Sequence, residues 1–425
     1  MNAMIVDSTA LPEQVVRDVL ASSFQSAGQR CSALRVLYLQ KDIADNLLEM
    51  LFGAMDELRL GDPALLSTDV GPVIDEAAKA KIEAHCAKYA AKGLLLKSLV
   101  APEEGLFVAP TVIKLDSIAE LEEEIFGPVL HVVTFEASNI NKVVDEINAT
   151  GYGLTFGLHT RVDTRVSQIC NRIKVGNIYV NRNQIGAIVG SQPFGGEGLS
   201  GTGPKAGGPE YVKRFMRSET AQPVATDLTA AVGANTLQQA IDGLDNSKWA
   251  IANNRIEKLQ PLFASTTDVD FSTLQHDAQP MPGPTGELNL LSTHARGTVL
   301  CLGPDLKTAL QHAVLALSQG NAVVVVAPGA EAECQAAIAE GLPVKAISGL
   351  LPGEVLASVN GIAAVASCAE AEVLQTYRVA LASREGVLLP LITERNAVER
   401  FTVERHLCID TTAAGGNASL IAASE

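Results

Sequence analysis

Apolar residues along the first half of the chain recur at spacings that predict alternating strands and helices. Residues 3–6 form a short apolar run that is typical of a strand. After Pro12, the apolar residues Val16, Leu20 and Phe24 repeat at every fourth position, which predicts a helix that begins at the proline. Further helices are predicted over 42–58, over 75–92 and near 141–147, and further strands over 129–135 and 177–181. This alternation predicts an α/β fold.

The pattern weakens over residues 218–287, which hold the only tryptophan, Trp249. We expect a linker with some helix here, including a helical segment over 237–263. From residue 288 the alternation returns, with a helix over 307–318 and strands over 299–302, over 322–327 and near 346, 363 and 387. The run 322–327 is so apolar that both of its faces should be buried. Repeated βα pairs of this kind predict a doubly wound, Rossmann-like sheet.

A dinucleotide fingerprint is missing from this last stretch. No Gly-x-Gly-x-x-Gly motif follows its first strand, although cofactor phosphates need such bare backbone at the start of the next helix. The residues Gly303-Pro304-Asp305 stand there instead and predict a turn.

Composition and charge narrow the class of protein. The chain has 425 residues, is 47% hydrophobic and 19% charged, and can therefore bury two or three cores. Its net charge of −16 argues against nucleic acid as a partner, which needs clustered Lys and Arg. The first residues lack the pattern of a signal peptide, and no uncharged apolar run is long enough to span a membrane. We expect a cytoplasmic protein that acts on small molecules.

Seven scattered cysteines without a Cys-x-x-Cys pair predict reduced thiols rather than disulfides or a zinc site. The seven histidines form no His-x-x-x-His or His-Glu-x-x-His pattern, so no catalytic metal is expected. Cys31 differs from the other cysteines because its neighbours in SAGQRCS are small or polar and include one cation. Such surroundings can expose a thiol and favour the thiolate, which attacks carbonyl groups. Cys86 and Cys170 on predicted helices, and Cys301 in a predicted strand, are instead expected in the core.

Two further segments allow more than one interpretation. The acidic run at 122–124, which enters the turn Phe126-Gly127-Pro128, is either a solvated helix end or a place where one carboxylate turns inward to hold a ribose diol. The segment 184–208 holds nine glycines and is either an ordinary flexible loop or bare backbone that approaches a ligand and offers N–H groups to an anion. Phe194 within it would suit the aromatic wall of a pocket.

Four motifs in order carry a family resemblance over about residues 2–216. The sequences SAGQRCSALR, EEEIFGPVL, GYGLTFGLHTR and GNIYVNRNQIGAIVGSQPFGGEGLSGTGPKAGGP resemble the catalytic domain of the aldehyde dehydrogenase superfamily. More narrowly, they resemble the L-glutamate γ-semialdehyde (1-pyrroline-5-carboxylate) dehydrogenase modules that bacteria fuse to a proline dehydrogenase. PGPTGELN, RGTVLCLGP and the terminal DTTAAGGNAS resemble the C-terminal domain of those fusions, which is Rossmann-like without a cofactor site.

The resemblance implies a division into an aldehyde dehydrogenase catalytic domain over 1–217, a linker over 218–287, a Rossmann-like domain over 288–405 and a flap-like terminal motif over 406–425. It also implies the chemistry. Cys31 would be the nucleophile that attacks L-glutamate γ-semialdehyde, and its backbone N–H would help to stabilise the oxyanion. Ser32 and the backbone N–H groups of Gly186 and Ala187 would bind the α-carboxylate of the substrate, and Phe194 would line the aldehyde tunnel.

The resemblance further implies NAD as the cofactor. Glu124 would hold the nicotinamide ribose, and Phe126 would lie against the same end of the cofactor. In the family, most of the NAD site, the general-base glutamate of a Glu-x-Gly-Gly motif and an oxyanion asparagine precede the strand at which this chain starts. We therefore expect an N-terminally truncated chain without them, and FAD would belong only to the absent proline dehydrogenase module.

Three hypotheses about the chain as a whole follow. It is a fragment of a γ-semialdehyde dehydrogenase of proline catabolism that is inactive alone, or one half of a split enzyme whose missing domain is a second chain. The third hypothesis is a non-catalytic scaffold that binds a partner protein. The resemblance leaves the oligomeric state and the activity of the chain alone open.

Overall fold

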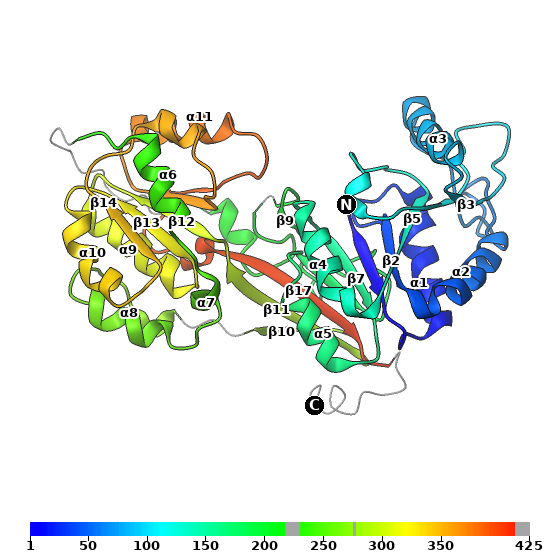
Figure 1. Ribbon diagram of the computed structural model, residues 1–425, viewed down its shortest axis with the longest axis horizontal. Coiled ribbons are helices and arrows are strands. Elements are labelled where there is room, and N and C mark those ends of the chain that lie inside the picture. The colour runs from blue at the N-terminus through cyan, green and yellow to red at the C-terminus, as the bar shows by residue number, and fades with distance from the viewer. Residues whose placement is uncertain (202, 217–229, 275–277, 413–425) are drawn as a thin grey trace. The chain divides into compact units, whose positions relative to one another are not determined.

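The computed structural model describes residues 1–201, 203–216, 230–274 and 278–412, and the terminal motif beyond Thr412 lies outside them (Figure 1). The chain divides into two compact units, of which the first comprises Met1–Gly208, Gln279–Leu291 and Arg405–Glu425, and the second Pro209–Ala278 and Ser292–Glu404. The two late segments belong to the first unit because they add strands to its sheet.

The first unit is built on a ten-stranded sheet in the order β10-β11-β17-β8-β7-β1-β2-β5-β4-β3. Its strands are β1 (Ala3–Val6), β2 (Val36–Gln40), β3 (Leu95–Ser98), β4 (Thr111–Lys114), β5 (Val129–Phe135), β7 (Thr155–His159), β8 (Asn177–Val180), β10 (Gln279–Met281), β11 (Glu287–Ala295) and β17 (Thr402–Asp410). Neighbours from β17 to β4 pair in parallel, so the amino ends of these strands share one edge of the sheet. A separate two-stranded sheet joins β6 (Tyr152–Gly153) to β9 (Glu197–Gly198).

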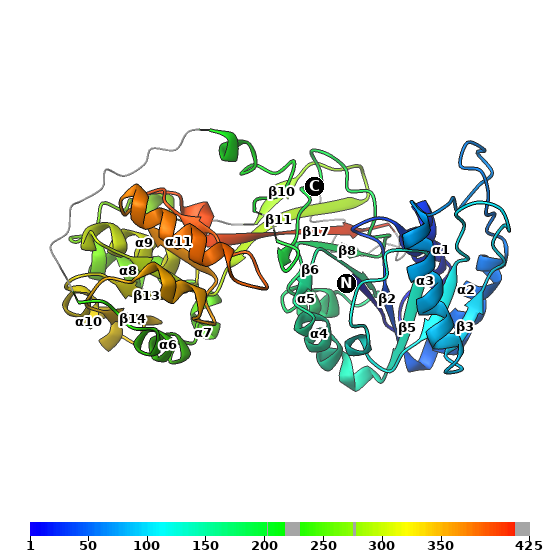
Figure 2. The ribbon, with the colours of Figure 1, turned by 90° about the horizontal axis from the view of Figure 1, so that it is seen from above.

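The helices of the first unit cover both faces of this sheet. They are α1 (Pro12–Phe24), α2 (Lys41–Asp56), α3 (Glu76–Ala90), α4 (Ile140–Ala149) and α5 (Asp163–Cys170). Figures 1 and 2 show α1 and α2 on one face and α4 and α5 on the other. The predicted strands and helices of residues 3–181 are all present, with ends that differ by one or two residues. They form here because the periodic apolar positions, such as Leu47, Leu51 and Met55 of α2, are buried.

The second unit confirms the predicted doubly wound sheet. Its order is β14-β13-β12-β15-β16, with every pair parallel. The strands are β12 (Thr298–Leu302), β13 (Ala322–Val326), β14 (Val344–Ile347), β15 (Ala364–Ser367) and β16 (Leu391–Ile392), and the helices α6 (Ala234–Asp242), α7 (Ser247–Ala250), α8 (Arg255–Phe263), α9 (Leu306–Ser318), α10 (Ala330–Ala339) and α11 (Ala371–Ala382).

Strand β13 is buried on both faces, as its sequence predicts. Val323 and Val325 belong to the core that includes α8 and α9. Val324 and Val326 belong to the opposite core, which includes α6 and α11. Alternate side chains of one strand thus meet two layers of helices, and this requires an unbroken apolar run.

Two sequence predictions for this unit were wrong in detail. The single helix over 237–263 is three helices, α6, α7 and α8, because Gly243 and the pair Asn253-Asn254 interrupt it. The strand near Val387 is β16, which begins four residues later at Leu391. Among the described residues, no helix is long and apolar enough to cross a membrane.

Candidate active site

The loop that carries Cys31 lies at the amino edge of the parallel sheet. The loop connects α1 to β2. It is flanked by Arg35, which directly precedes β2, and by Asn2, which directly precedes β1. Cys31 is the one exposed cysteine of the seven, all of which the structure describes. Cys170 and Cys301 are buried, as expected from their elements, whereas Cys86, also expected in the core, is half-buried.

Buried side chains hold the backbone of this loop. Asn2 donates from Nδ2 to the carbonyl of Cys31 at 2.7 Å, and its Oδ1 accepts from the N–H of Thr155 at 3.3 Å. The carbonyl of Ser32 accepts from Thr155 Oγ1 at 3.1 Å and from Gln184 Nε2 at 3.2 Å. Residues at the starts of β1 and β7 therefore fix the path of the chain on both sides of the thiol.

A left-handed turn leads into the loop. Ser26, Ala27 and Gly28 have φ angles of 55°, 51° and 64°, in the region that costs a residue with a side chain about 1–2 kcal/mol. At Gly28 the backbone is also crowded, since an added Cβ would lie 2.1 Å from the carbonyl oxygen of Gly127. The turn thus brings the Cys31 loop into direct backbone contact with the loop that precedes β5.

Arg35 joins these two loops, and the sequence analysis did not single it out. Its side chain is 1% exposed, and its Nε donates to Glu124 Oε1 at 2.9 Å. Its Nη1 donates to the carbonyls of Gly28 at 2.7 Å and Gly127 at 3.2 Å, and its Nη2 donates to the carbonyl of Arg30 at 3.2 Å. Burial lowers the pKa of Arg35, and the Glu124 carboxylate opposes that shift.

The acidic run at 122–124 turns one carboxylate inward. Glu123 is exposed and pairs with Lys81, whereas Glu124 is 30% exposed and faces the buried guanidinium. The ring of Phe126 is 44% exposed, and the Arg35 Cζ lies 4.9 Å from its centroid. The structure therefore brings Glu124 and Phe126 to the Cys31 loop through Arg35.

The glycine-rich segment reaches the loop at one point. Gln184 contacts the carbonyl of Ser32, and two residues later Gly186 is exposed, with a φ of 71° and open space where a Cβ would stand. Ala187 and Phe194 are half-buried. Asn177 at the start of β8 fixes the backbone on both sides of Phe194, because it donates to the carbonyl of residue 193 at 2.9 Å and accepts from the N–H of residue 195 at 3.1 Å. Within the described ranges, no hydrogen bond joins Ser32, Gly186, Ala187 and Phe194 to one another.

Two histidines lie behind Arg35. The carbonyl of Arg35 is 3.0 Å from His131 Nδ1, and His131 Nε2 is 2.9 Å from His85 Nε2. Because a carbonyl only accepts, His131 donates from Nδ1 and must accept at Nε2 from His85. Burial lowers the pKa of His131 to about 3 and that of His85 to about 4, so both rings are neutral at pH 7.

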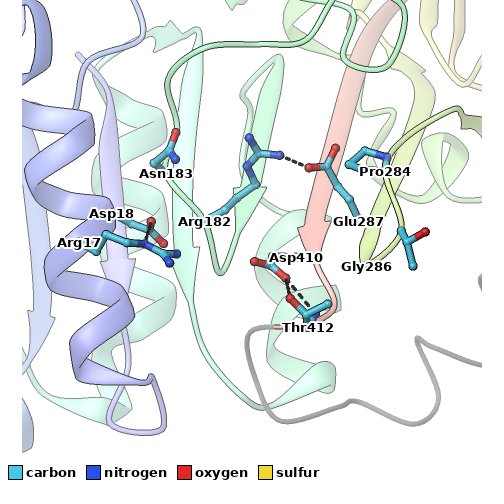
Figure 3. Close-up of a pocket in the computed structure, with 10 residues that line it drawn as sticks. Arg17, Asp18, Arg182, Asn183, Pro284, Gly286, Glu287, Asp410 and Thr412 are labelled. Atoms are coloured by element: carbon cyan, nitrogen blue, oxygen red, sulfur yellow. Dashed lines mark hydrogen bonds and ion pairs between the residues drawn. The ribbon is translucent and has the colours of Figure 1, made fainter. Parts of the chain in front are cut away.

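A pocket of about 260 Å³ lies at the opposite, carboxyl edge of the same sheet. It is lined by Arg17, Asp18, Arg182, Asn183, Pro284, Thr285, Gly286, Glu287, Asp410 and Thr412 (Figure 3). Arg182 pairs with Glu287, and Arg17 pairs with Asp18. None of the predicted site residues lines this pocket. In the part of the chain that the structure describes, no cluster of three or more His, Cys, Asp or Glu side chains could hold a metal ion.

His159 lies at the end of β7, 3.8 Å from Asp18, and makes the stability of the first unit depend on pH. Burial lowers its pKa to about 4, so below pH 6.5 the unfolded chain binds a proton that the folded chain does not. Its contribution to stability is therefore complete above pH 6.5 and is lost as the pH falls towards 4, at about 1.4 kcal/mol per pH unit. We expect His159→Leu to reduce this slope in urea unfolding followed by circular dichroism. Parallel slopes in the two proteins would contradict the prediction.

Comparisons with known proteins identify the family of the chain. Residues 1–221 match the model of the aldehyde dehydrogenase family. Bifunctional protein PutA of Salmonella typhimurium is 43% identical over 452 residues, which cover 99% of this chain and 33% of that protein. The 1-pyrroline-5-carboxylate dehydrogenase 1 of Halalkalibacterium halodurans is 38% identical over 222 residues, which cover 52% of this chain and 43% of that protein.

Among solved structures, a variant of proline utilization A from Bradyrhizobium japonicum is 56% identical over 51% of this chain and 22% of that chain, with a TM-score of 0.50. The chain thus spans about a third of the length of the bifunctional relatives that it matches. The activity of these relatives is therefore that of proteins about three times as long as this chain.

Proposed function

Because the chain belongs to the aldehyde dehydrogenase family, we propose that it is the thiol-bearing part of an NAD-dependent L-glutamate γ-semialdehyde dehydrogenase of proline catabolism. The observation that carries the proposal is the exposed Cys31 on a loop whose backbone is anchored by Asn2 and Arg35. The names of the relatives support the same substrate, since they are a 1-pyrroline-5-carboxylate dehydrogenase and bifunctional PutA proteins.

The proposed reaction begins at the Cys31 sulfur. Its thiolate adds to the aldehyde carbon, a C–S bond forms, and the backbone N–H of Cys31 donates to the new oxyanion. When bound, NAD⁺ would supply the acceptor for the hydride that leaves this carbon. Water then adds to the resulting thioester, the C–S bond breaks, and glutamate and the free thiol are released. The base that takes the proton from this water is proposed to lie on an upstream domain or a second chain.

The described residues fit one end of the cofactor. Glu124 keeps its carboxylate partly exposed, as a ribose diol requires, and the exposed ring of Phe126 offers a flat apolar surface beside it. In the second unit, Gly303-Pro304-Asp305 follows strand β12 and offers no glycine-rich cradle for the phosphates. We propose that Glu124 and Phe126 hold the nicotinamide end of NAD and that the remaining contacts to NAD come from the upstream domain.

The substrate residues are proposed from their places around the thiol. Ser32 is buried beside Cys31, and Gly186 exposes its backbone in open space two residues after Gln184, which contacts Ser32. The Ser32 hydroxyl and the N–H groups of Gly186 and Ala187 bind the α-carboxylate, and Phe194 forms a wall of the aldehyde tunnel. None of these contacts involves the pocket of Figure 3.

The test is NADH formation from L-glutamate γ-semialdehyde, measured with the purified chain alone and after mixing with the upstream domain of a bifunctional relative. We expect no activity alone and activity on mixing. Activity of the chain alone would place the base and the NAD site within it and overturn the proposed division. If neither sample forms NADH although the mixed proteins associate, the result would favour a non-catalytic scaffold.

Ser32→Ala tests the carboxylate contact. A hydrogen bond to a charged group contributes about 1.5–3 kcal/mol, so the KM for L-glutamate γ-semialdehyde should rise by about ten-fold or more. The KM for propanal, which has no carboxylate, should stay within about two-fold. Ser98→Ala on the remote strand β3 is the control. Equal rises for both aldehydes would exclude Ser32 from carboxylate binding.

A further inference from the structure

We infer that Arg35 is a positioning residue that holds the Cys31 loop and the Glu124 loop in one arrangement. This inference rests on the proposed function for its catalytic meaning, but the contacts themselves stand without it. Two of its carbonyl acceptors, at Gly28 and Arg30, precede Cys31, and the other two acceptors belong to Glu124 and Gly127. One buried side chain therefore bridges segments that are about ninety residues apart in the sequence.

The shape of the guanidinium explains why this position needs arginine. Its N–H donors point in fixed directions in one plane and meet four acceptors at 2.7–3.2 Å. A lysine ammonium is a point charge with three donors on a flexible stem, and it cannot reach all four acceptors at once. It would leave at least one buried acceptor unpaired, which costs about 1–3 kcal/mol.

Both ends of Arg35 are fixed. Its backbone carbonyl accepts from the N–H of His131 at 2.9 Å and from His131 Nδ1 at 3.0 Å. Its guanidinium lies over the ring of Phe126. The two loops that it joins also touch directly, because a Cβ added at Gly28 would lie 2.1 Å from the carbonyl oxygen of Gly127. Loss of a guanidinium held in this way should therefore release both loops, whereas loss of one acceptor should release only the loop that carries it.

The substrate residues are held by a different set of contacts. The side chains of Asn2, Thr155 and Gln184 anchor the carbonyls of Cys31 and Ser32, and the four bonds of the Arg35 guanidinium go to other residues. Asn2 meets Arg35 through backbone atoms, since the Arg35 N–H donates to the Asn2 carbonyl at 3.1 Å, and Arg35→Lys keeps this bond. Loss of the guanidinium should therefore displace Glu124 and the turn at 26–30 while the aldehyde side of the site persists. A kinetic split follows, in which kcat falls and the KM for NAD rises while the KM for the aldehyde changes little. General loss of stability would not produce this split.

The experiment uses the full chain, and its first readout is independent of activity. Hydrogen exchange is measured by mass spectrometry in Arg35→Lys, in the wild type and in the control Arg255→Met. Arg255 also donates to four backbone carbonyls, but in the second unit. We expect exchange in Arg35→Lys to accelerate about ten-fold or more in both 26–31 and 122–127. Arg255→Met should leave both segments unchanged.

Acceleration in only one segment, or in neither, would overturn the inference. If Arg35→Lys does not fold, Glu124→Gln replaces it. This variant removes the ion pair but keeps the three carbonyl bonds of Arg35, so exchange should accelerate over 122–127 and stay unchanged over 26–31. Acceleration over both segments, or no acceleration, would contradict the role of Arg35.

The kinetic split is then measured on the chain mixed with the upstream domain of a bifunctional relative. An inactive wild-type mixture would count against the proposed function while the exchange result still decides the role of Arg35. Equal rises in both KM values in Arg35→Lys would reduce Arg35 to a general structural residue.

Discussion

Replacing Cys31 by alanine should abolish aldehyde oxidation in the assembled enzyme, with a loss of about a thousand-fold or more in kcat. The reason is chemical, because no other group in this loop can form the C–S bond on which the proposed reaction depends. The measurement is NADH formation at saturating aldehyde and NAD. Cys86→Ala is the matched control, since Cys86 is a half-buried thiol of the same unit and lies on α3. Full activity in Cys31→Ala, or an equal loss in Cys86→Ala, would contradict the assignment.

The other thiols are poor competitors for this role. Burial raises the pKa of Cys170, Cys334 and Cys408 to about 12 and that of Cys368 to about 11, so these groups stay protonated at neutral pH. Protonated, buried thiols react slowly because the thiolate is the nucleophile. Iodoacetamide should therefore label Cys31 first, as peptide mapping can show.

The fold could be predicted from the sequence wherever a single local pattern has a single structural solution. The run of β13 is apolar at every position, and its alternate residues fill two different cores. The stretch 237–263 has weaker periodicity, and its first and last helices bury their apolar residues in different cores, Leu237 of α6 in one and Leu259 and Phe263 of α8 in the other. The limits of such helices depend on packing partners that are distant in the sequence, and a local sequence pattern holds no information about those partners.

The same distinction separates the site residues. Cys31 could be singled out because its immediate neighbours are small and polar, and this local setting agrees with its exposure. Asn2 and Arg35 act through partners 29 and 89 residues away, so nothing beside them in the sequence indicates their contacts. Each is a polar residue that directly precedes an apolar strand, and only the structure shows that both are buried.

The second large effect is expected at Gly28. An alanine there would have to keep a φ of 64°, and its Cβ would stand 2.1 Å from the carbonyl oxygen of Gly127 and 2.8 Å from that of Ser23. Both obstacles are backbone atoms, which cannot rotate away. We expect Gly28→Ala to lose about 3 kcal/mol or more of unfolding free energy, or to separate the two loops and lose activity. Urea unfolding and NADH formation measure the two outcomes.

Substitutions at two other glycines separate the cost of the left-handed conformation at Gly28 from the cost of its close contact with Gly127. Gly93 has a φ of 71° with open space around it, so Gly93→Ala should show only the cost of the left-handed conformation, about 1 kcal/mol. Gly53 lies within α2, also in open space, and Gly53→Ala should stabilise the protein by about 0.5–1 kcal/mol. The excess loss in Gly28→Ala over Gly93→Ala then measures the contact between the loops that Arg35 bridges. If the two losses were equal, that contact would be too loose to set the distance between the Cys31 thiol and Glu124.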